Sequence, residues 1–124
     1  MRKDQCLKIA QDWLSYFEKV LQSGNSNHIE DCFHSESHWR DLLAFTGTIS
    51  PYEGAKEISL GLNSSQKIAQ AHSFRIIDKH TQPRLVNRLG RPVIEAIFSF
   101  ETKLGSGEGV VRLPEDSLTT AWTF

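Results

Sequence analysis

A run of charged and aromatic residues stands directly before an apolar segment in the first half of the chain. Trp39, Arg40 and Asp41 are consecutive within FHSESHWRDLLAFTGTIS, residues 33–50. A guanidinium is always charged and presents its donors in a fixed fork. On the wall of an apolar cavity, Arg40 could therefore stabilise an enolate, alkoxide or carbonyl oxygen as negative charge develops there. The alternative is a structural ion pair with one of three carboxylates, those of Asp41, Glu95 and Glu101.

Two neighbours of Arg40 are candidates for moving a proton. Asp41 could act as a general base or could orient Arg40, but consecutive residues of an extended segment point to opposite faces. A local cap or ion pair is therefore the favoured interpretation of Asp41. His38 shares the extended phase of Arg40, and histidine titrates near neutral pH, so it could act as a general acid or base. The competing interpretation of His38 is an ordinary surface histidine.

A further carboxylate, that of Glu95, lies between Val93 and Ile97 on one face of an expected strand. Apolar neighbours would raise its pKa, and it could then exchange protons near pH 7. The other face of the same strand is better suited to the core. We therefore favour a Glu95 that lies in a dimer interface or faces solvent.

Two histidines, His34 and His38, are four residues apart, a spacing that places both on one face of a helix, as in metal sites. No third ligand follows at a diagnostic spacing, and Ser35-Glu36-Ser37 indicates a turn. The sequence therefore predicts no metal site.

Aromatic residues and one further histidine are candidates for the wall of a substrate pocket. Most of the aromatic residues are expected to fill the core, but a pocket for a polycyclic or terpenoid-like substrate would draw its walls from the same residues. His72 heads an expected strand and could face the cavity, or it could lie at the core edge bonded to backbone. The predicted substrate-binding residues are Trp13, Phe17, Trp39, His72, Phe98, Phe100 and Trp122.

Length and composition indicate one globular domain covering residues 1–124. The formal net charge of −1 provides no overall field that would attract nucleic acid or an anionic membrane. Arg84, Arg88 and Arg91 surround an expected hairpin tip at residues 89–92 and are interpreted as a solvated loop, because no aromatic platform accompanies them.

The cellular location is predicted from the cysteines and from apolar runs. Cys6 and Cys32 lie in apolar patterns and are expected to be buried free thiols in a reducing compartment. The first residues, MRKDQCLKIAQDWL, contain no continuous apolar stretch, so we expect no secretory signal. No apolar run approaches membrane-spanning length. We therefore expect a cytoplasmic protein.

Helices are predicted in the first part of the chain. Apolar residues at alternating spacings of three and four predict an amphipathic helix that ends at residues 23–25. A short helix is predicted to start at Asn27, with Glu30 in the capping-box position. A third helix is predicted from Glu53 to Leu62, before the polar triplet 63–65. The apolar stripe of the first helix consists of Leu7, Ala10, Leu14, Phe17 and Leu21, widened by Trp13 and Val20.

Strands are predicted in the second part, which makes the chain α+β rather than alternating α/β. The alternation is strongest over residues 93–101, where Ile94, Ala96, Phe98 and Phe100 share one face. Further strands are predicted at 72–77, 110–113 and 118–124, and turns at 105–109 and 114–117. A curved antiparallel sheet with helices on one face forms a cone with an apolar interior.

The pattern WRDLLAFT at residues 39–46, followed by Gly54 and Ile58, resembles the N-terminal domain of fungal flavin-dependent monooxygenase-like proteins. That domain has the nuclear-transport-factor-2-like (SnoaL-like) cone fold. The resemblance continues through IEAIF and FET in 94–102, GVVRL in 109–113 and AWTF in 121–124. It therefore covers nearly the whole chain, although relatives continue beyond the position of Phe124 with more strand and an acidic helical tail.

The resemblance implies a function without a cofactor. No flavin or nicotinamide domain follows, and GSGEG at 105–109 opens no helix, so it is no dinucleotide fingerprint. Stand-alone relatives of this fold in fungal natural-product pathways are cofactor-independent isomerases, cyclases and dehydratases. We therefore expect an isomerase or cyclase acting on a small hydrophobic intermediate. The alternative is a non-catalytic module that forms a homodimer through its sheet and binds a small molecule or a partner oxygenase.

Overall fold

The computed structural model describes residues 2–40, 51–77, 82–88, 90–103 and 105–123. Along the chain, α1 and α2 come first, β1 and β2 follow, and α4 precedes β3 to β7. The Asp41 side chain and the apolar run after it lie outside the described residues.

The first helix, α1 (Lys3–Ser23), forms as the spacing of apolar residues predicts. It ends at Gly24, whose φ of 75° is a left-handed conformation that glycine adopts without steric cost. One side of the helix is buried along its whole length. The buried residues of this side are Cys6, Ala10, Trp13, Leu14, Phe17, Val20 and Leu21.

The second helix, α2 (Ser26–Glu30), has its cap two residues before the predicted one. Oδ1 of Asn25 accepts hydrogen bonds from the backbone N–H groups of Asn27 and His28. Asn25 is therefore the N-terminal cap, and the prediction that Asn27 caps the helix was wrong.

The third described helix, α4 (Ala55–Ala69), is longer than predicted. It continues through the polar triplet 63–65 because Leu62, Ser65 and Ala69 keep one side of the helix buried. Tertiary packing therefore outweighs the weak helix propensity of asparagine and serine.

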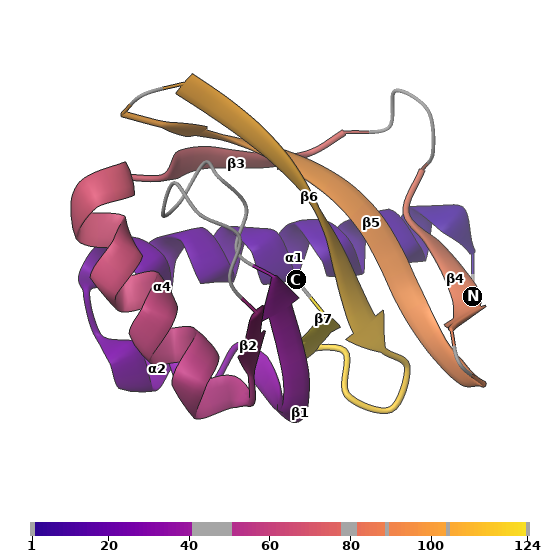
Figure 1. Cartoon of the computed structure of the whole chain (residues 1–124). Coiled ribbons are helices and arrows are strands. Elements are labelled where there is room, and N and C mark those ends of the chain that lie inside the picture. The colour runs from indigo at the N-terminus through magenta and orange to yellow at the C-terminus, as the bar shows by residue number, and fades with distance from the viewer. Residues whose placement is uncertain (1, 41–50, 78–81, 89, 104, 124) are drawn as a thin grey trace.

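The described strands form one sheet in the order β2-β1-β7-β6-β5-β3, and β4 pairs with β5 outside this path. Neighbours are antiparallel except β1 and β7, which are parallel. α1 crosses behind β5 and β6, whereas α2 and α4 lie beside β1 and β2 (Figure 1). The strands are β1 (Phe33–Arg40), β2 (Pro51–Glu53), β3 (His72–Ile76), β4 (Arg84–Arg88), β5 (Arg91–Thr102), β6 (Gly105–Pro114) and β7 (Ala121–Thr123).

The apolar core lies between the helices and one face of this sheet, which is the predicted α+β arrangement. The alternating residues of β5 that were predicted to face the core are each at most 3% exposed, and they belong to one cluster with the buried side of α1. Ile58 and Leu62 add the buried side of α4 to the same cluster.

Two segments that were predicted to be turns are strands. Residues 35–37 lie inside β1, and residues 105–109 lie in β6, where each pairs with a residue of β5. The chain reverses direction between Thr102 and Gly105, which are register partners. The glycines of residues 105–109 therefore belong to a strand and not to a turn, and one of them, Gly109, lies close to the ring of Phe98 on the neighbouring strand.

Candidate functional site

The end of β1 carries the residues on which the predicted catalytic site depends. The backbone of His38, Trp39 and Arg40 forms the last part of β1 and pairs with Glu53, Tyr52 and Pro51 of β2 in that order. His38 also has Thr123 of β7 as a register partner on the other side. The three residues thus occupy a strand with neighbours on both sides, as the extended phase of this segment predicts. Their roles, and that of Asp41, remain proposals.

Glu95 is the centre of the most extensive ion-pair network among the described residues. Its side chain is only 9% exposed. Arg88 donates two hydrogen bonds to it, from Nε to Oε2 and from Nη2 to Oε1, both at 2.8 Å. Nε of Arg112 donates to Oε2 at 2.7 Å, and Nη2 of Arg84 donates to Oε1 at 3.1 Å. Three guanidinium groups therefore converge on one buried carboxylate.

The sheet register explains why these side chains meet. Arg84 of β4 and Arg112 of β6 are the direct partners of Glu95 on its two neighbouring strands. Arg88 lies four residues after Arg84 on β4, so it lies on the same face. The buried residues Ile94 and Ala96 alternate with Glu95 and face the core. The network therefore lies on the face of the sheet away from α1.

The pKa of Glu95 is shifted in the direction opposite to the prediction. Hydrogen bonds from Arg88 lower it most; burial opposes this, but further hydrogen bonds from Arg112 and the charges of both arginines bring it from 4.5 to about 2. The predicted raised pKa was therefore wrong, because cross-strand arginines outweigh the apolar neighbours along the strand. Glu95 stays ionised at neutral pH and is a poor proton carrier there.

Arg91, at the start of β5, extends this basic region. Its guanidinium carbon lies 5.1 Å from the ring centroid of Trp122, which is a cation–π distance. Nη2 of Arg91 lies 3.4 Å from Nε2 of His34 and 3.9 Å from Oδ1 of Asp116. The interpretation of the three hairpin arginines as a solvated loop was therefore wrong. The half-buried Trp122 remains a proposed substrate contact.

Three of the predicted wall residues, Phe17, Phe98 and Phe100, lie in the core. Phe74 stacks on Phe100 with ring centroids 5.2 Å apart and lies edge-on to Phe17 at 5.5 Å. Phe98 lies 6.0 Å from the rings of both Phe74 and Phe100. These rings pack against one another, so their described contacts are those of a core cluster.

His72 lies on the surface, which corrects the prediction that it faces a cavity. Its side chain is 49% exposed, and Nε2 lies 3.6 Å from Oε2 of the similarly exposed Glu101. Nδ1 lies 2.9 Å from the carbonyl oxygen of Gln70. The next residue, Ser73, has a φ of 56°, so the regular alternation of β3 begins only after His72.

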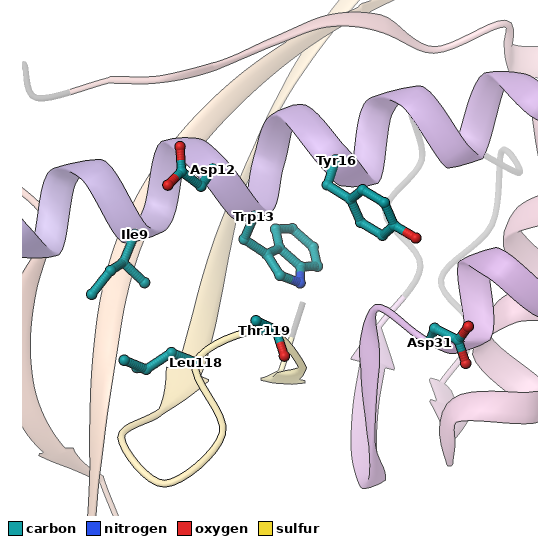
Figure 2. Close-up of a pocket in the computed structure, with 7 residues that line it drawn as sticks. All are labelled: Ile9, Asp12, Trp13, Tyr16, Asp31, Leu118 and Thr119. Carbon is teal, nitrogen blue, oxygen red and sulfur yellow. The ribbon is translucent and has the colours of Figure 1, made fainter.

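A groove of about 470 Å³ lies between α1 and the connections that precede β1 and β7. In Figure 2, the indole of Trp13 points from α1 toward Thr119, and the ring of Tyr16 extends toward Asp31. Nε1 of Trp13 donates to the carbonyl oxygen of Cys32 at 3.0 Å, which fixes the indole in the groove wall. The groove is lined by Ile9, Asp12, Trp13, Tyr16, Asp31, Leu118 and Thr119.

Sequence reasoning found only one residue of this groove, Trp13. Tyr16 is 49% exposed, and this exposure cannot be read from the sequence. Asp31, Leu118 and Thr119 reach the groove only through the tertiary fold, because they lie on the connections before β1 and before β7. No sequence motif joins these segments to α1.

Within the described part of the chain, the histidine, acidic and cysteine side chains form neither a metal site nor a reactive thiol. In that part, no cluster of three or more histidine, cysteine or acidic residues could hold a metal ion. Cys6 and Cys32 are buried and free, as predicted. Burial, followed by the charge of Asp31, raises the pKa of Cys32 to about 12, so its thiol is protonated and unreactive at neutral pH.

Comparison with solved structures identifies the fold. The structure "Rd1NTF2_05 with long sheet" is 12% identical, with a TM-score of 0.57, and the match covers 93% of this chain and 92% of that chain. A steroid delta-isomerase from Pseudomonas aeruginosa is 17% identical, with a TM-score of 0.53, over 91% and 74%. PrhC from Penicillium brasilianum NBRC 6234 is 16% identical, with a TM-score of 0.53, over 98% and 78%.

These likenesses show that the chain has the nuclear-transport-factor-2-like α+β fold, as predicted. No family model matches the sequence, and no curated protein matches it. A fold of this kind supports unrelated functions, so the function has to be argued from the site. Among the described helices, none is long and apolar enough to cross a membrane.

Proposed function

We propose that this protein is a cofactor-independent isomerase or cyclase that acts on a small hydrophobic intermediate of fungal secondary metabolism. The observation that carries the proposal is the position of His38, Trp39 and Arg40 at the end of β1, between β2 and β7 of a cone-type sheet. The fold is shared with a steroid delta-isomerase and with PrhC, and the resemblance to fungal natural-product proteins points the same way.

In the proposed mechanism, Arg40 stabilises the oxyanion that forms as a bond is rearranged or a ring closes. His38, two residues earlier on the same strand, shares the phase of Arg40 and moves the proton, with Asp41 as the second candidate. Glu95 does not take this role, because its pKa is about 2. Holding the substrate beside these groups by itself removes a large part of the barrier.

Replacing Arg40 with alanine is expected to reduce product formation by about 100-fold, the typical cost of removing one oxyanion donor. The measurement is metabolite profiling of the source organism after deletion of the gene, with parent or variant copies returned. Arg75→Ala is the matched control, because Arg75 is an exposed arginine of β3. Full restoration of the product by the Arg40→Ala copy would assign Arg40 to the scaffold. A deletion that changes no metabolite would exclude the enzymatic function.

The second candidate function is a non-catalytic module that binds a small molecule beside a partner flavin monooxygenase. The observation that favours it is the groove along α1, whose floor and walls combine Trp13 and Tyr16 with Ile9 and Leu118. Its volume suits one small molecule of mainly apolar surface. A module of this kind would return its ligand unchanged.

Tyr16→Ala is expected to weaken binding of a neutral naphthyl dye, N-phenyl-1-naphthylamine, by about tenfold, because it removes one aromatic wall. Dye fluorescence titration measures the effect. Leu60→Ala is the matched control, since Leu60 is 52% exposed and Tyr16 is 49% exposed. Equal dye affinity in the parent and in Tyr16→Ala would exclude the groove as the binding site.

A further inference from the structure

The groove beside α1 combines an apolar wall with negative charge. Two of its lining residues, Asp12 and Asp31, are acidic, and none of the lining residues that the structure describes is basic. We propose that the groove binds an organic cation, a small apolar molecule whose protonated amine lies between the ring of Tyr16 and the carboxylate of Asp31. The binding of such a cation rests on the second candidate function, and it specifies the chemical class of the ligand.

The apolar body of such a ligand has a wall that is formed in advance. Ile9 and Leu118 line the groove from α1 and from the connection before β7, and both pack against the core cluster. The indole of Trp13 is held on two sides, because it stacks on Phe17 with ring centroids 4.9 Å apart and donates from Nε1 to the carbonyl oxygen of Cys32. A wall that does not have to be ordered by the ligand lowers the entropic cost of binding.

Tyr16 and Asp31 supply the two groups that recognise a cation. The ring of Tyr16 is 49% exposed, and it extends toward Asp31 in Figure 2. An aromatic face attracts an ammonium group that lies within about 6 Å of the ring centroid. A carboxylate attracts the same charge and accepts its hydrogen bonds. An ammonium group between the two side chains would therefore gain both interactions.

The backbone around Asp31 is fixed at this end of the groove. The N–H group of Asp31 donates to the carbonyl oxygen of Asn27 at 3.3 Å, at the end of α2. The carbonyl oxygen of the next residue, Cys32, accepts hydrogen bonds from Trp13 and from the backbone N–H of Ala121. The residue that bears the carboxylate is thus tied to α2, to α1 and to β7.

The charge of Asp31 acts on the groove wall, whereas that of Asp12 is already paired. Burial, followed by the charge of Asp31, raises the pKa of the Cys32 thiol. Oδ2 of Asp12 accepts a hydrogen bond from Nζ of Lys8 at 2.9 Å, and both of these side chains are more than 60% exposed. We therefore assign the recognition of the cation to Asp31.

Anionic and neutral ligands fit this lining less well. An anion would be repelled by both carboxylates of the groove, Asp12 and Asp31. A neutral ligand would use the apolar wall, but it would also remove water from the carboxylate of Asp31 without replacing it, which costs free energy. A protonated amine on the ligand replaces that water with an opposite charge. The groove volume of about 470 Å³ lies within the range of small-molecule sites.

The test compares three ligands that share one naphthalene body and differ in charge at pH 7. They are 1-naphthylmethylamine, which is cationic, 1-naphthalenemethanol, which is neutral, and 1-naphthoate, which is anionic. In isothermal titration of the parent protein, we expect the amine to bind about tenfold more tightly than the alcohol, and the carboxylate to bind most weakly.

Two results with the parent protein would overturn the inference, and they can be told apart. If the amine binds no more tightly than the alcohol, the preference for a cation is wrong, and the groove remains a site for neutral apolar molecules. If neither compound binds, the inference and the second candidate function are both wrong.

Asp31→Asn tests which carboxylate is responsible. The substitution keeps the size of the side chain and is expected to abolish the advantage of the amine over the alcohol. Asp116→Asn is the matched control, because Asp116 is 78% exposed on the connection that carries Leu118 and is not a lining residue. The advantage is a ratio measured within one variant, so a loss of folded protein affects both ligands alike. Retention of the advantage in Asp31→Asn would overturn the site, and so would an equal loss in both variants, which would show diffuse attraction by the surface.

Discussion

Glu95→Gln is expected to lower the free energy of unfolding by about 2 to 3 kcal/mol at pH 7, as measured by denaturant unfolding. The substitution keeps the size of the side chain and removes its charge. Arg88 then loses the partner of its fork, and Arg112 loses a 2.7 Å hydrogen bond. The expected cost lies below that of breaking a fully buried pair, because the arginines are between 31% and 43% exposed and can turn toward water.

The same carboxylate predicts how stability depends on pH. Its pKa is about 2 in the folded protein and 4.5 when unperturbed, so the unfolded chain binds the proton more tightly. The stabilisation from Glu95 is therefore complete above about pH 4.5 and is lost as the pH falls toward 2. Over this interval the parent protein should lose stability more steeply than Glu95→Gln, and the two should approach each other at the acidic end.

Glu101→Gln provides the matched control for this prediction. Glu101 lies on the same strand, but its side chain is 52% exposed, and its Oε2 lies 3.6 Å from Nε2 of His72. We expect a change of no more than about 0.5 kcal/mol from this variant. If Glu95→Gln were as stable as the parent protein across the whole pH range, the network would contribute nothing to folding and the arginines would be held by other contacts.

The prediction for Glu95 failed because the sequence was considered along one strand only. Its neighbours on β5, Val93 and Ile97, are apolar, but the residues that set its pKa belong to β4 and β6. Half of this environment depends on the hairpin that joins β4 to β5. The expected tip at residues 89–92 would have placed Ile97 opposite Arg84, whereas Arg88 pairs with Arg91 and Arg84 therefore pairs with Glu95.

The other half, the pairing of Glu95 with β6, was not predicted because the glycines of β6 were interpreted as a turn. A turn over residues 105–109 would have placed Glu95 opposite the region of Thr119, whereas the true reversal after Thr102 places it opposite Arg112. The alternation of β5 and the stripe of α1 were predictable, because each reflects burial of one continuous face. Register between β5 and β6 depends on one local choice, and an error of a few residues there changes every cross-strand pair.

In the candidate site, too, local features could be predicted from the sequence, whereas contacts between distant segments could not. The extended phase of His38 and Arg40 follows from local pattern, and β1 has it. The groove on α1 could not be predicted, because Asp31 and Thr119 approach Tyr16 only after β1 and β7 have paired. Local pattern therefore indicated the extended backbone of His38 and Arg40, although not the whole of β1, and long-range pairing determined which segments share a site.

Gly109→Ala is expected to destabilise the protein by about 2 to 3 kcal/mol in denaturant unfolding, the upper part of the usual range for overpacking of a core. Gly109 lies directly opposite Phe98 on β5. A Cβ atom at this position would lie 2.6 Å from Cζ and 3.0 Å from Cε1 of the Phe98 ring. The ring cannot easily move away, because Phe98 is 2% exposed and packs against both Phe74 and Phe100.

Two variants separate this clash from a general effect of alanine in the strand. Gly105→Ala places the same methyl group at a position of β6 where nothing lies within 4 Å, and it should leave stability unchanged or raise it slightly. Phe98→Leu should cost less in the Gly109→Ala background than in the parent, because the smaller side chain removes the overlap. Additive effects of the two substitutions would mean that the ring and the new methyl group do not meet. The coupling between them therefore tests directly why a glycine stands in the middle of this strand.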